Sequence, residues 1–278
     1  MTRHRAKKSL GQNFLVDANQ QRRIVEAVGA GPADTVLEIG PGQGALTRHL
    51  AGSVGRLIIV ELDNDLAAAM QAEYAGHDDV RVVHADFMDV RLQDLTDDVG
   101  RLTVVGNIPY NITTPIIFRL LERDNRPRRI VLMIQKEVAD RIVAPPGAGS
   151  YGALSVGVRT VARVERLFTV PRRSFRPVPG VDSAVIRIEP FSPPRLSAAE
   201  DADVRELTRT AFSWRRKQLQ KTLRAAPGYE LASGAVDQVA AEAGIAATAR
   251  PEELAPEQFV ALARALRRRS RPLADGGA

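Results

Sequence analysis

The chain has 278 residues, of which 44% are hydrophobic and 26% charged, a composition typical of a globular protein with one large domain or two. It contains no cysteine, which excludes disulfides, thiolate metal sites and a cysteine nucleophile, and its four histidines form no i,i+4 pair for zinc, so we expect no metal. No run approaches the roughly 18 apolar residues that span a bilayer, and no hydrophobic signal core follows the basic start, so we expect a cytoplasmic protein that binds no membrane.

The net charge of +6 is unevenly distributed along the chain. Residues 34–98 contain 13 acidic and four basic residues. Basic residues gather in the N-terminal arm, over 159–176 and over 205–224. A single basic run is typical of a solvated surface, but three such runs around an acidic centre favour binding to a polyanion, of which nucleic acid is the obvious one.

Segments with strand and helix patterns alternate over the first 143 residues. A helix is expected between Asp17, a cap residue, and Gly29. Apolar runs predict strands over 35–39, 57–60, 80–83, 102–105 and 130–134, and helical spacing predicts helices over 45–50, 64–74, 114–121 and 136–143. This alternation indicates an α/β fold with a doubly wound, mostly parallel sheet. The strands expected over 162–168 and 183–188 have no helix between them and predict an antiparallel closing hairpin.

The texture of the sequence changes after Glu189, where Pro190, Pro193 and Pro194 mark a linker. The rest of the chain has no strand-like run and predicts a small helical domain. Its helices are expected over 199–212, 214–224, 234–243 and 256–268. We therefore expect two domains, covering residues 1–192 and 193–278.

A glycine-rich turn, with Gly40, Gly42 and Gly44, joins the first strand of the predicted sheet to its helix. Such a turn lets a ligand approach bare backbone, although it also serves packing alone. Glu61 ends the second strand about 20 residues later, where an acid can accept hydrogen bonds from both ribose hydroxyls of a nucleoside cofactor. Asp86 follows the third strand and is interpreted either as a contact of an adenine amino group or as a helix cap. These residues alone leave a nicotinamide enzyme and a methyltransferase open.

The next strand ends in Asn107, Ile108, Pro109 and Tyr110, which resemble the Asn-Pro-Pro-Tyr signature of methyltransferases that act on exocyclic amino groups. An adenine N6 amine is a poor nucleophile because its lone pair is delocalised into the ring. Its two hydrogens need acceptors, which the Asn107 side chain and the Ile108 carbonyl can supply, and Tyr110 offers a stacking face for a base removed from its helix. This favours a Rossmann-like, S-adenosylmethionine-dependent methyltransferase sheet over a turn that only packs.

The chain as a whole resembles the small-subunit (16S) rRNA adenine N6,N6-dimethyltransferase family. The run from Lys8 to Leu15 resembles the family's opening segment, and the resemblance implies that this arm covers the cofactor and contributes Asn13 and Leu15. The other cofactor-binding residues that the resemblance implies are Gly40, Gly42, Glu61, Asp86 and Asn107. It also implies that Phe175, in a segment continuing with Pro177 and Pro179, stacks on the target adenine opposite Tyr110.

The resemblance extends into the helical domain, where it implies contacts with rRNA. The RNA-binding residues expected in the two domains are Arg172, Arg173, Arg215, Arg216, Lys217 and Lys221. The sequence departs from the family pattern at Gln218, Lys221 and Ala153, which bears on RNA docking or packing and not on the chemistry.

The family implies dimethylation of two adjacent adenosines near the 3′ end of the small-subunit rRNA, in a precursor subunit, by a monomeric enzyme with a role in ribosome biogenesis. Three other interpretations stay open. They are the paralogous methyltransferase that modifies large-subunit (23S) rRNA and gives antibiotic resistance, a non-catalytic ribosome assembly factor, and a nicotinamide oxidoreductase.

Overall fold

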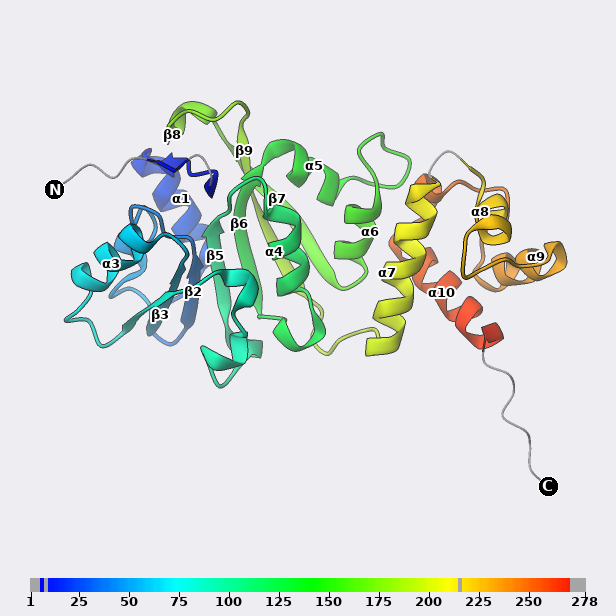
Figure 1. The fold of residues 1–278 in the computed structure, drawn as a ribbon, viewed down its shortest axis with the longest axis horizontal. Coiled ribbons are helices and arrows are strands. Elements are labelled where there is room, and N and C mark those ends of the chain that lie inside the picture. Colours follow the sequence, from blue (N-terminus) through cyan, green and yellow to red (C-terminus); the bar gives the residue numbers. More distant parts are fainter. Residues whose placement is uncertain (1–5, 8–9, 215–216, 271–278) are drawn as a thin grey trace, which may run out of the picture. The chain divides into compact units, whose positions relative to one another are not determined.

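The computed structural model describes residues 6–7, 10–214 and 217–270 (Figure 1). The contacts divide the chain into two compact units, one of Met1–Asp140 and Ala162–Ser192 and the other of Arg141–Val161 and Pro193–Ala278. The boundary expected between residues 192 and 193 is one of the junctions. Residues 141–161, expected in the first domain, instead belong to the second unit.

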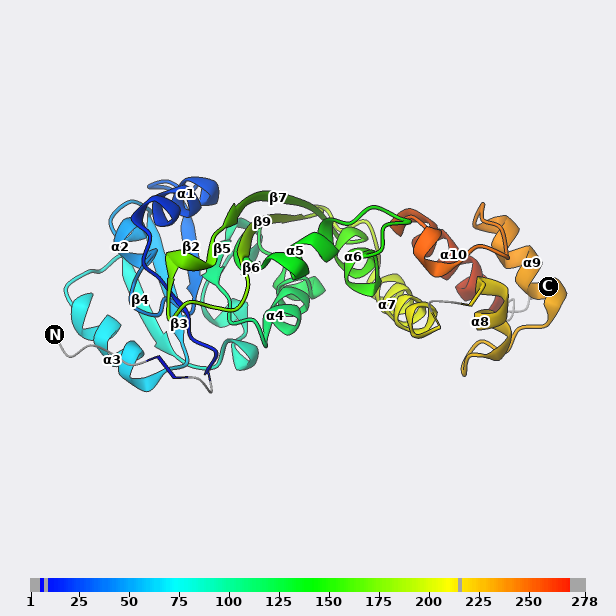
Figure 2. The same cartoon turned by 90° about the horizontal axis from the view of Figure 1, so that it is seen from above.

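The first unit is built on a seven-stranded sheet in the order β4-β3-β2-β5-β6-β9-β7 (Figures 1 and 2). Its strands are β2 (Thr35–Ile39), β3 (Arg56–Glu61), β4 (Val80–His84), β5 (Thr103–Asn107), β6 (Arg129–Gln135), β7 (Ala162–Val170) and β9 (Ser183–Pro190). β2 to β6 are parallel, and β9 pairs antiparallel with both β6 and β7. This is the doubly wound, Rossmann-like sheet that the sequence predicts, including its antiparallel hairpin.

The central strands are buried along most of their length, which explains their continuous apolar sequences. In β3, Leu57, Ile58 and Ile59 are all 0% exposed. The helices of this unit are α1 (Ala18–Val28), α2 (Thr47–Leu50), α3 (Asn64–Glu73), α4 (Thr113–Leu120) and α5 (Lys136–Val143), the last of which continues into the second unit.

The position of the site follows from the strand order. From β2 the chain proceeds outward through β3 to β4, then returns to β5 on the other side of β2 and continues to β6. The carboxyl ends of β2 and β5 therefore flank a topological switch point, where open α/β sheets bind their ligands. A separate two-stranded ribbon pairs β1 (Phe14–Leu15) with β8 (Phe175–Arg176), so that Leu15 lies opposite Phe175.

The second unit is helical. Its helices are α6 (Ala153–Arg159), α7 (Ala198–Ser213), α8 (Leu219–Ala225), α9 (Ser233–Glu242) and α10 (Pro256–Ser270). The rings of Phe212 and Phe259 stack with centroids 5.8 Å apart. Tyr151 is fully buried, packs edge-on against Phe212 and donates a 2.7 Å hydrogen bond to the Leu254 carbonyl. These contacts explain why residues 141–161 belong to this unit and not to the sheet.

Candidate active site

A cavity of about 200 Å³ lies at the carboxyl ends of the parallel strands, within the first unit. Five segments from separate parts of the sequence line it: residues 10–15 of the N-terminal arm, the glycine turn after β2, the end of β3, the residues after β4, and the corner after β5. The expected site residues among them are Asn13, Leu15, Gly40, Gly42, Glu61, Asp86, Asn107, Ile108, Pro109 and Tyr110. The structure therefore brings together every residue expected to bind cofactor and all but one of those expected to act on the substrate.

The glycine turn presents its backbone to this cavity. Gly40, Gly42 and Gly44 all have positive φ angles, between 58° and 72°. A Cβ added at Gly40 would meet no atom within 4 Å, whereas one added at Gly42 would lie 3.0 Å from the Phe14 ring of the arm. The turn thus needs glycine for its conformation throughout, and at Gly42 also for the close approach of the arm.

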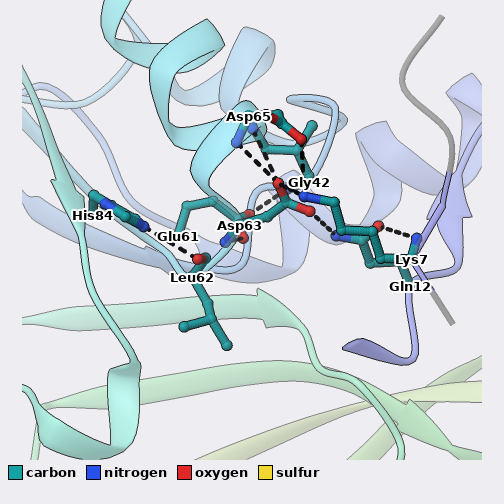
Figure 3. Close-up of polar contacts among 9 residues, drawn as sticks. Lys7, Gln12, Gly42, Glu61, Leu62, Asp63, Asp65 and His84 are labelled. Atoms are coloured by element: carbon teal, nitrogen blue, oxygen red, sulfur yellow. Dashed lines mark hydrogen bonds and ion pairs between the residues drawn. The ribbon is translucent and has the colours of Figure 1, made fainter. Parts of the chain in front are cut away.

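Glu61 sits at the end of β3 with its carboxylate held by backbone amides. Oε2 accepts a hydrogen bond from Gly42 N at 3.2 Å, and Oε1 accepts one from Asp63 N at 2.8 Å (Figure 3). The side chain is 6% exposed, and this burial raises the pKa of Glu61 above its ordinary value. A carboxylate has about four lone-pair sites, so both oxygens can still accept a hydroxyl.

A second acid, Glu38, lies on β2 beside the turn and lines the same cavity. Its Oε2 accepts a 2.7 Å hydrogen bond from the Thr47 hydroxyl. Burial raises the pKa of Glu38 to about 7, because the Thr47 hydrogen bond only partly offsets the loss of solvation. Two acidic side chains, Glu38 and Glu61, therefore lie at one end of the sheet beside the cavity, and burial disfavours the charged form of both.

Asp86 follows β4 and lines the cavity next to Ala85 and Phe87. One of its carboxylate oxygens accepts a 2.8 Å hydrogen bond from Met88 N and caps the short helix η2 (Phe87–Asp89). The two interpretations of Asp86 are therefore compatible, because one oxygen caps the helix while the residue faces the cavity.

The corner after β5 holds Asn107 and Tyr110 in defined positions. Asn107 Nδ2 donates a 2.9 Å hydrogen bond to the Asn13 carbonyl, which fixes the amide orientation and leaves Oδ1 as an acceptor. The Tyr110 hydroxyl lies 2.9 Å from Ser183 Oγ on β9. Gly106 makes this corner possible, because a Cβ there would lie 2.7 Å from Ile108 Cδ1 and 2.9 Å from the Ile39 carbonyl oxygen.

Charged and polar side chains attach the N-terminal arm to the start of α3 (Figure 3). Lys7 Nζ lies 2.8 Å from Asp63 and 2.9 Å from Asp65, and Gln12 Nε2 donates to Asp63 at 2.9 Å. Burial alone would raise the pKa of Asp63, but the hydrogen bonds from Lys7 and Gln12 outweigh it and hold the pKa at about 2. The carboxylate of Asp63 is therefore ionised and paired throughout the physiological pH range.

Comparison with known proteins identifies the family. Residues 3–267 match the family described as ribosomal RNA adenine dimethylase. The chain belongs to this family. Proteins named ribosomal RNA small subunit methyltransferase A from Geobacter metallireducens and Pseudomonas fluorescens are each 42% identical to it, over 94% of this chain and 96% of the first, and over 98% of this chain and 98% of the second.

Two solved structures share the fold over nearly the whole chain. The 23S rRNA methyltransferase ErmE is 30% identical, with a TM-score of 0.69, and the match covers 92% of this chain and 100% of that one. A dimethyladenosine transferase from Plasmodium falciparum has a TM-score of 0.74 at 24% identity, with 90% of this chain and 95% of that one covered. The fold expected from the sequence is thus confirmed as that of S-adenosylmethionine-dependent methyltransferases.

S-adenosylmethionine is the cofactor of this fold, and the cavity of this rRNA adenine dimethylase fits it. Space is open at Gly40, the oxygens of Glu61 can accept ribose hydroxyls, and the acidic groups suit a cationic sulfonium. In the part of the chain that the structure describes, no three potential metal ligands are grouped to hold an ion. Nor is any helix there long and apolar enough to cross a bilayer.

The expectation that Phe175 stacks on the target base disagrees with this structure. The residue is 1% exposed and packs in the core with Leu15, Val170 and Val185, and it does not line the cavity. The pairing of β1 with β8 explains its burial, because Leu15 lies directly opposite Phe175. A ring without an exposed face cannot stack on a base, so in this conformation Tyr110 is the aromatic residue of the expected pair that reaches the cavity.

The residues expected to bind RNA lie outside the cavity. Arg172 and Arg173 are exposed on the short helix η6 (Arg172–Ser174) of the first unit, and Lys217 and Lys221 are exposed in the second unit. Arg215 and Arg216 lie outside the described residues. These positions are accessible to a polyanion, and their role in RNA binding stays a prediction.

Sequence reasoning missed the polar partners of the arm. In the sequence, Lys7 belongs to the basic arm that favours nucleic acid, and Asp63 lies in the acidic stretch 34–98 with no predicted role. One signal was available: Asp63 comes two residues after Glu61 and directly before a helix, which is the position of an N-cap.

Proposed function

We propose that this chain transfers methyl groups from S-adenosylmethionine to N6 of adenosines in the rRNA of the small ribosomal subunit. The resemblance to its family extends this proposal to dimethylation of two adjacent adenosines near the 3′ end, in a precursor subunit. The observation that carries the proposal is one cavity that combines the glycine turn and Glu61 with the corner at Asn107.

The residues of the corner match the needs of an exocyclic amine. Asn107 Oδ1 is free to accept one N6 hydrogen because Nδ2 is bound to the Asn13 carbonyl. The carbonyl of Ile108, a residue that lines the same cavity, is the acceptor that we assign to the other hydrogen. Two acceptors favour a pyramidal nitrogen and stabilise the positive charge that develops on it. The Tyr110 ring supplies a face on which the extruded base stacks.

The remaining contribution of the chain is positioning. The bound cofactor supplies a methyl group on a sulfonium, an electrophile that needs no further activation. Glu61 and the glycine turn hold the nucleoside part, and the rigid corner places the amine in line with the reacting carbon. The acidic surroundings favour capture of the cationic sulfonium and do not act as a general base. When N6 accepts the methyl group, sulfur leaves as a neutral thioether and the nitrogen releases one of its protons to water.

The small-subunit assignment is favoured over the large-subunit one by similarity over the full chain. The relatives named small-subunit methyltransferase A are 42% identical, whereas the 23S rRNA methyltransferase ErmE is 30% identical. Both enzymes would use the same corner, so only the modified RNA separates them.

The test is transfer of labelled methyl to small subunits, large subunits and deproteinised rRNA, with the modified positions mapped. We expect dimethyladenosine in small subunits, lost in Asn107→Ala and retained in Asn19→Ala, a matched change on the exposed face of α1. Label in large-subunit rRNA would instead assign the chain to the resistance paralogues. Cofactor binding without any transfer would identify a binding factor.

A further inference from the structure

The N-terminal arm is bound on both sides of the cavity, at the cofactor side and at the substrate side. On the cofactor side, Lys7 and Gln12 contact Asp63 at the start of α3. On the substrate side, the Asn13 carbonyl accepts the hydrogen bond from Asn107. Residues 10–15 of the arm, which include Gln12 and Asn13, line the cavity.

The contacts on the cofactor side form a compact group, which we call the arm latch: Lys7, Gln12, Asp63 and Asp65 (Figure 3). The Asp63 side chain has 0% exposure and that of Lys7 39%, so one partner is fully buried. The Gln12 amide uses both ends, since Oε1 accepts from Lys7 N at 2.8 Å while Nε2 donates to Asp63. A buried carboxylate with two side-chain donors from one segment fixes that segment more strongly than an exposed ion pair does.

The arm latch is connected to the cofactor acid through one residue. Asp63 receives Lys7 and Gln12 on its side chain, and its own backbone N–H donates to Glu61 Oε1 at 2.8 Å. Its side chain also caps α3 by accepting from Asp65 N and Leu66 N. A shift of Asp63 would therefore move a hydrogen bond that orients Glu61.

The other end of the arm determines which way the Asn107 amide points. The Asn13 carbonyl can only accept, so it selects the rotamer in which Nδ2 faces the arm and Oδ1 faces away from it. If the arm leaves this position, the amide is free to flip and to present a donor to the substrate amine, which needs an acceptor.

We infer that Lys7 is a positioning residue that, through the arm latch, holds residues 10–15 over the cavity and so fixes both Glu61 and the Asn107 amide. The effect on the Asn107 amide rests on the proposed function, whereas the effect on Glu61 requires only that the cavity binds the cofactor. Lys7 lies in a basic run that favours RNA binding, but its ammonium group forms ion pairs with Asp63 at 2.8 Å and Asp65 at 2.9 Å. The inference therefore assigns it a different role.

The first measurement is cofactor-side binding without RNA, using S-adenosylhomocysteine as the titrant in calorimetry. We expect Lys7→Met to weaken the dissociation constant about 10-fold, the size expected when one hydrogen bond to a charged group is lost, and Lys7→Arg to restore most of it. The matched control is Arg128→Met, which removes an ion pair of 3.0 Å with Asp34 at the opposite end of the strands and should bind as wild type does.

Ionic strength provides a readout that a purely structural role would not change. S-adenosylhomocysteine has no net charge near neutral pH, so its own binding responds little to salt. Since the Lys7 side chain is partly exposed, salt screens its attraction to Asp63 and Asp65. Between 0.05 M and 0.5 M salt we expect binding to weaken in wild type and in Arg128→Met but to stay flat in Lys7→Met.

The second measurement is methyl transfer at saturating cofactor. If the arm orients Asn107, kcat falls about 10-fold in Lys7→Met, as expected for misplaced reacting groups, even after the KM for S-adenosylmethionine has been overcome. Asp65→Asn, which removes the exposed half of the arm latch and leaves the Asp63 cap intact, keeps the test valid if Lys7→Met fails to fold, and should show both effects to a smaller degree.

Wild-type binding, salt response and kcat in Lys7→Met, or in Asp65→Asn if only that variant folds, would overturn the inference. Weaker RNA binding with unchanged cofactor binding would also overturn it and would assign Lys7 to the RNA surface. A wild-type protein that transfers no methyl to any RNA would refute the proposed function, while the binding and salt measurements would still decide the role of the arm latch.

Discussion

Replacing Glu61 with glutamine tests the cofactor site with the smallest possible change in shape. The carboxylate accepts one backbone hydrogen bond on each oxygen, from Gly42 N and Asp63 N. A glutamine has one acceptor oxygen, so its NH2 group must face one of these N–H donors. The shorter bond, 2.8 Å from Asp63, should keep the oxygen, which leaves the new donor pointing at Gly42.

The magnitude of the effect follows from the hydrogen bonds that the variant cannot form with the bound cofactor. At least one ribose hydroxyl loses a charged acceptor, and a hydrogen bond to a charged group contributes about 1.5 to 3 kcal/mol. We therefore expect the dissociation constant to weaken about 10- to 150-fold. The stability of the unliganded variant should fall by less than its binding free energy does. Burial disfavours the charged carboxylate of Glu61 and raises its pKa, so removing the charge removes this desolvation penalty.

The assay is calorimetric titration with S-adenosylhomocysteine at pH 8, with Glu165→Gln as the control. Glu165 is an exposed acid on β7 whose carboxylate pairs with Arg187 and does not line the cavity, so its variant should bind like wild type. A folded Glu61→Gln protein that binds within about threefold of wild type would show that this acid does not hold the ribose, and would refute the assignment of the cofactor site.

Three further predictions concern the substrate corner and the buried acids. Gly106→Ala should lower the free energy of unfolding by about 1 to 3 kcal/mol through overpacking and should reduce kcat. The control is Gly31→Ala, where an added Cβ meets nothing within 4 Å and the stability should change by less than about 0.5 kcal/mol. Urea unfolding measures both variants, and equal stability would contradict the close approach at Gly106. Tyr110→Phe removes the hydroxyl contact with Ser183 and should lower the free energy of unfolding by about 1 kcal/mol, but its activity should stay within a few-fold of wild type because the stacking face remains. Tyr110→Ala should be inactive, and an active alanine variant would exclude stacking. The pKa of Glu38 is raised from 4.5 to about 7, so between these values the folded protein holds a proton that the unfolded chain has lost, and this residue's contribution to stability decreases as pH rises. Between pH 5 and pH 8 the free energy of unfolding of Glu38→Gln should therefore increase by about 2 to 3 kcal/mol relative to that of wild type, measured by urea unfolding. Parallel pH profiles of the two proteins would show that the acid is not buried uncharged.

Much of the fold and most of the site could be predicted because they depend on short-range patterns. Parallel strands buried on both faces have continuous apolar sequences, as β3 shows, and their carboxyl ends meet at one edge. Glu61, Asp86 and Asn107 each follow such a strand, so their convergence at the cavity could be inferred without coordinates.

The parts that sequence did not predict depend on contacts across long separations. α6 (Ala153–Arg159) contains Gly157 and two valines, which are weak helix formers, and it packs against α7 and α10. The helix expected over 214–224 begins only at Leu219. The family resemblance predicts Phe175 at the substrate, but its pairing with Leu15 joins segments 160 residues apart and buries the ring.

The arm shows most clearly why charge patterns along a sequence are ambiguous. Lys7 lies in a basic run, and such runs favour a polyanion because their neighbours in sequence offer no opposite charge. Folding supplies the opposite charge from 56 residues away, in the acidic centre, and the ion pair forms at a buried carboxylate that also caps a helix. A basic residue near an acidic segment of the same chain can therefore serve assembly of the site, and only the position of its partner distinguishes this role from RNA binding. The expected salt response of cofactor binding in Lys7→Met measures that distinction directly.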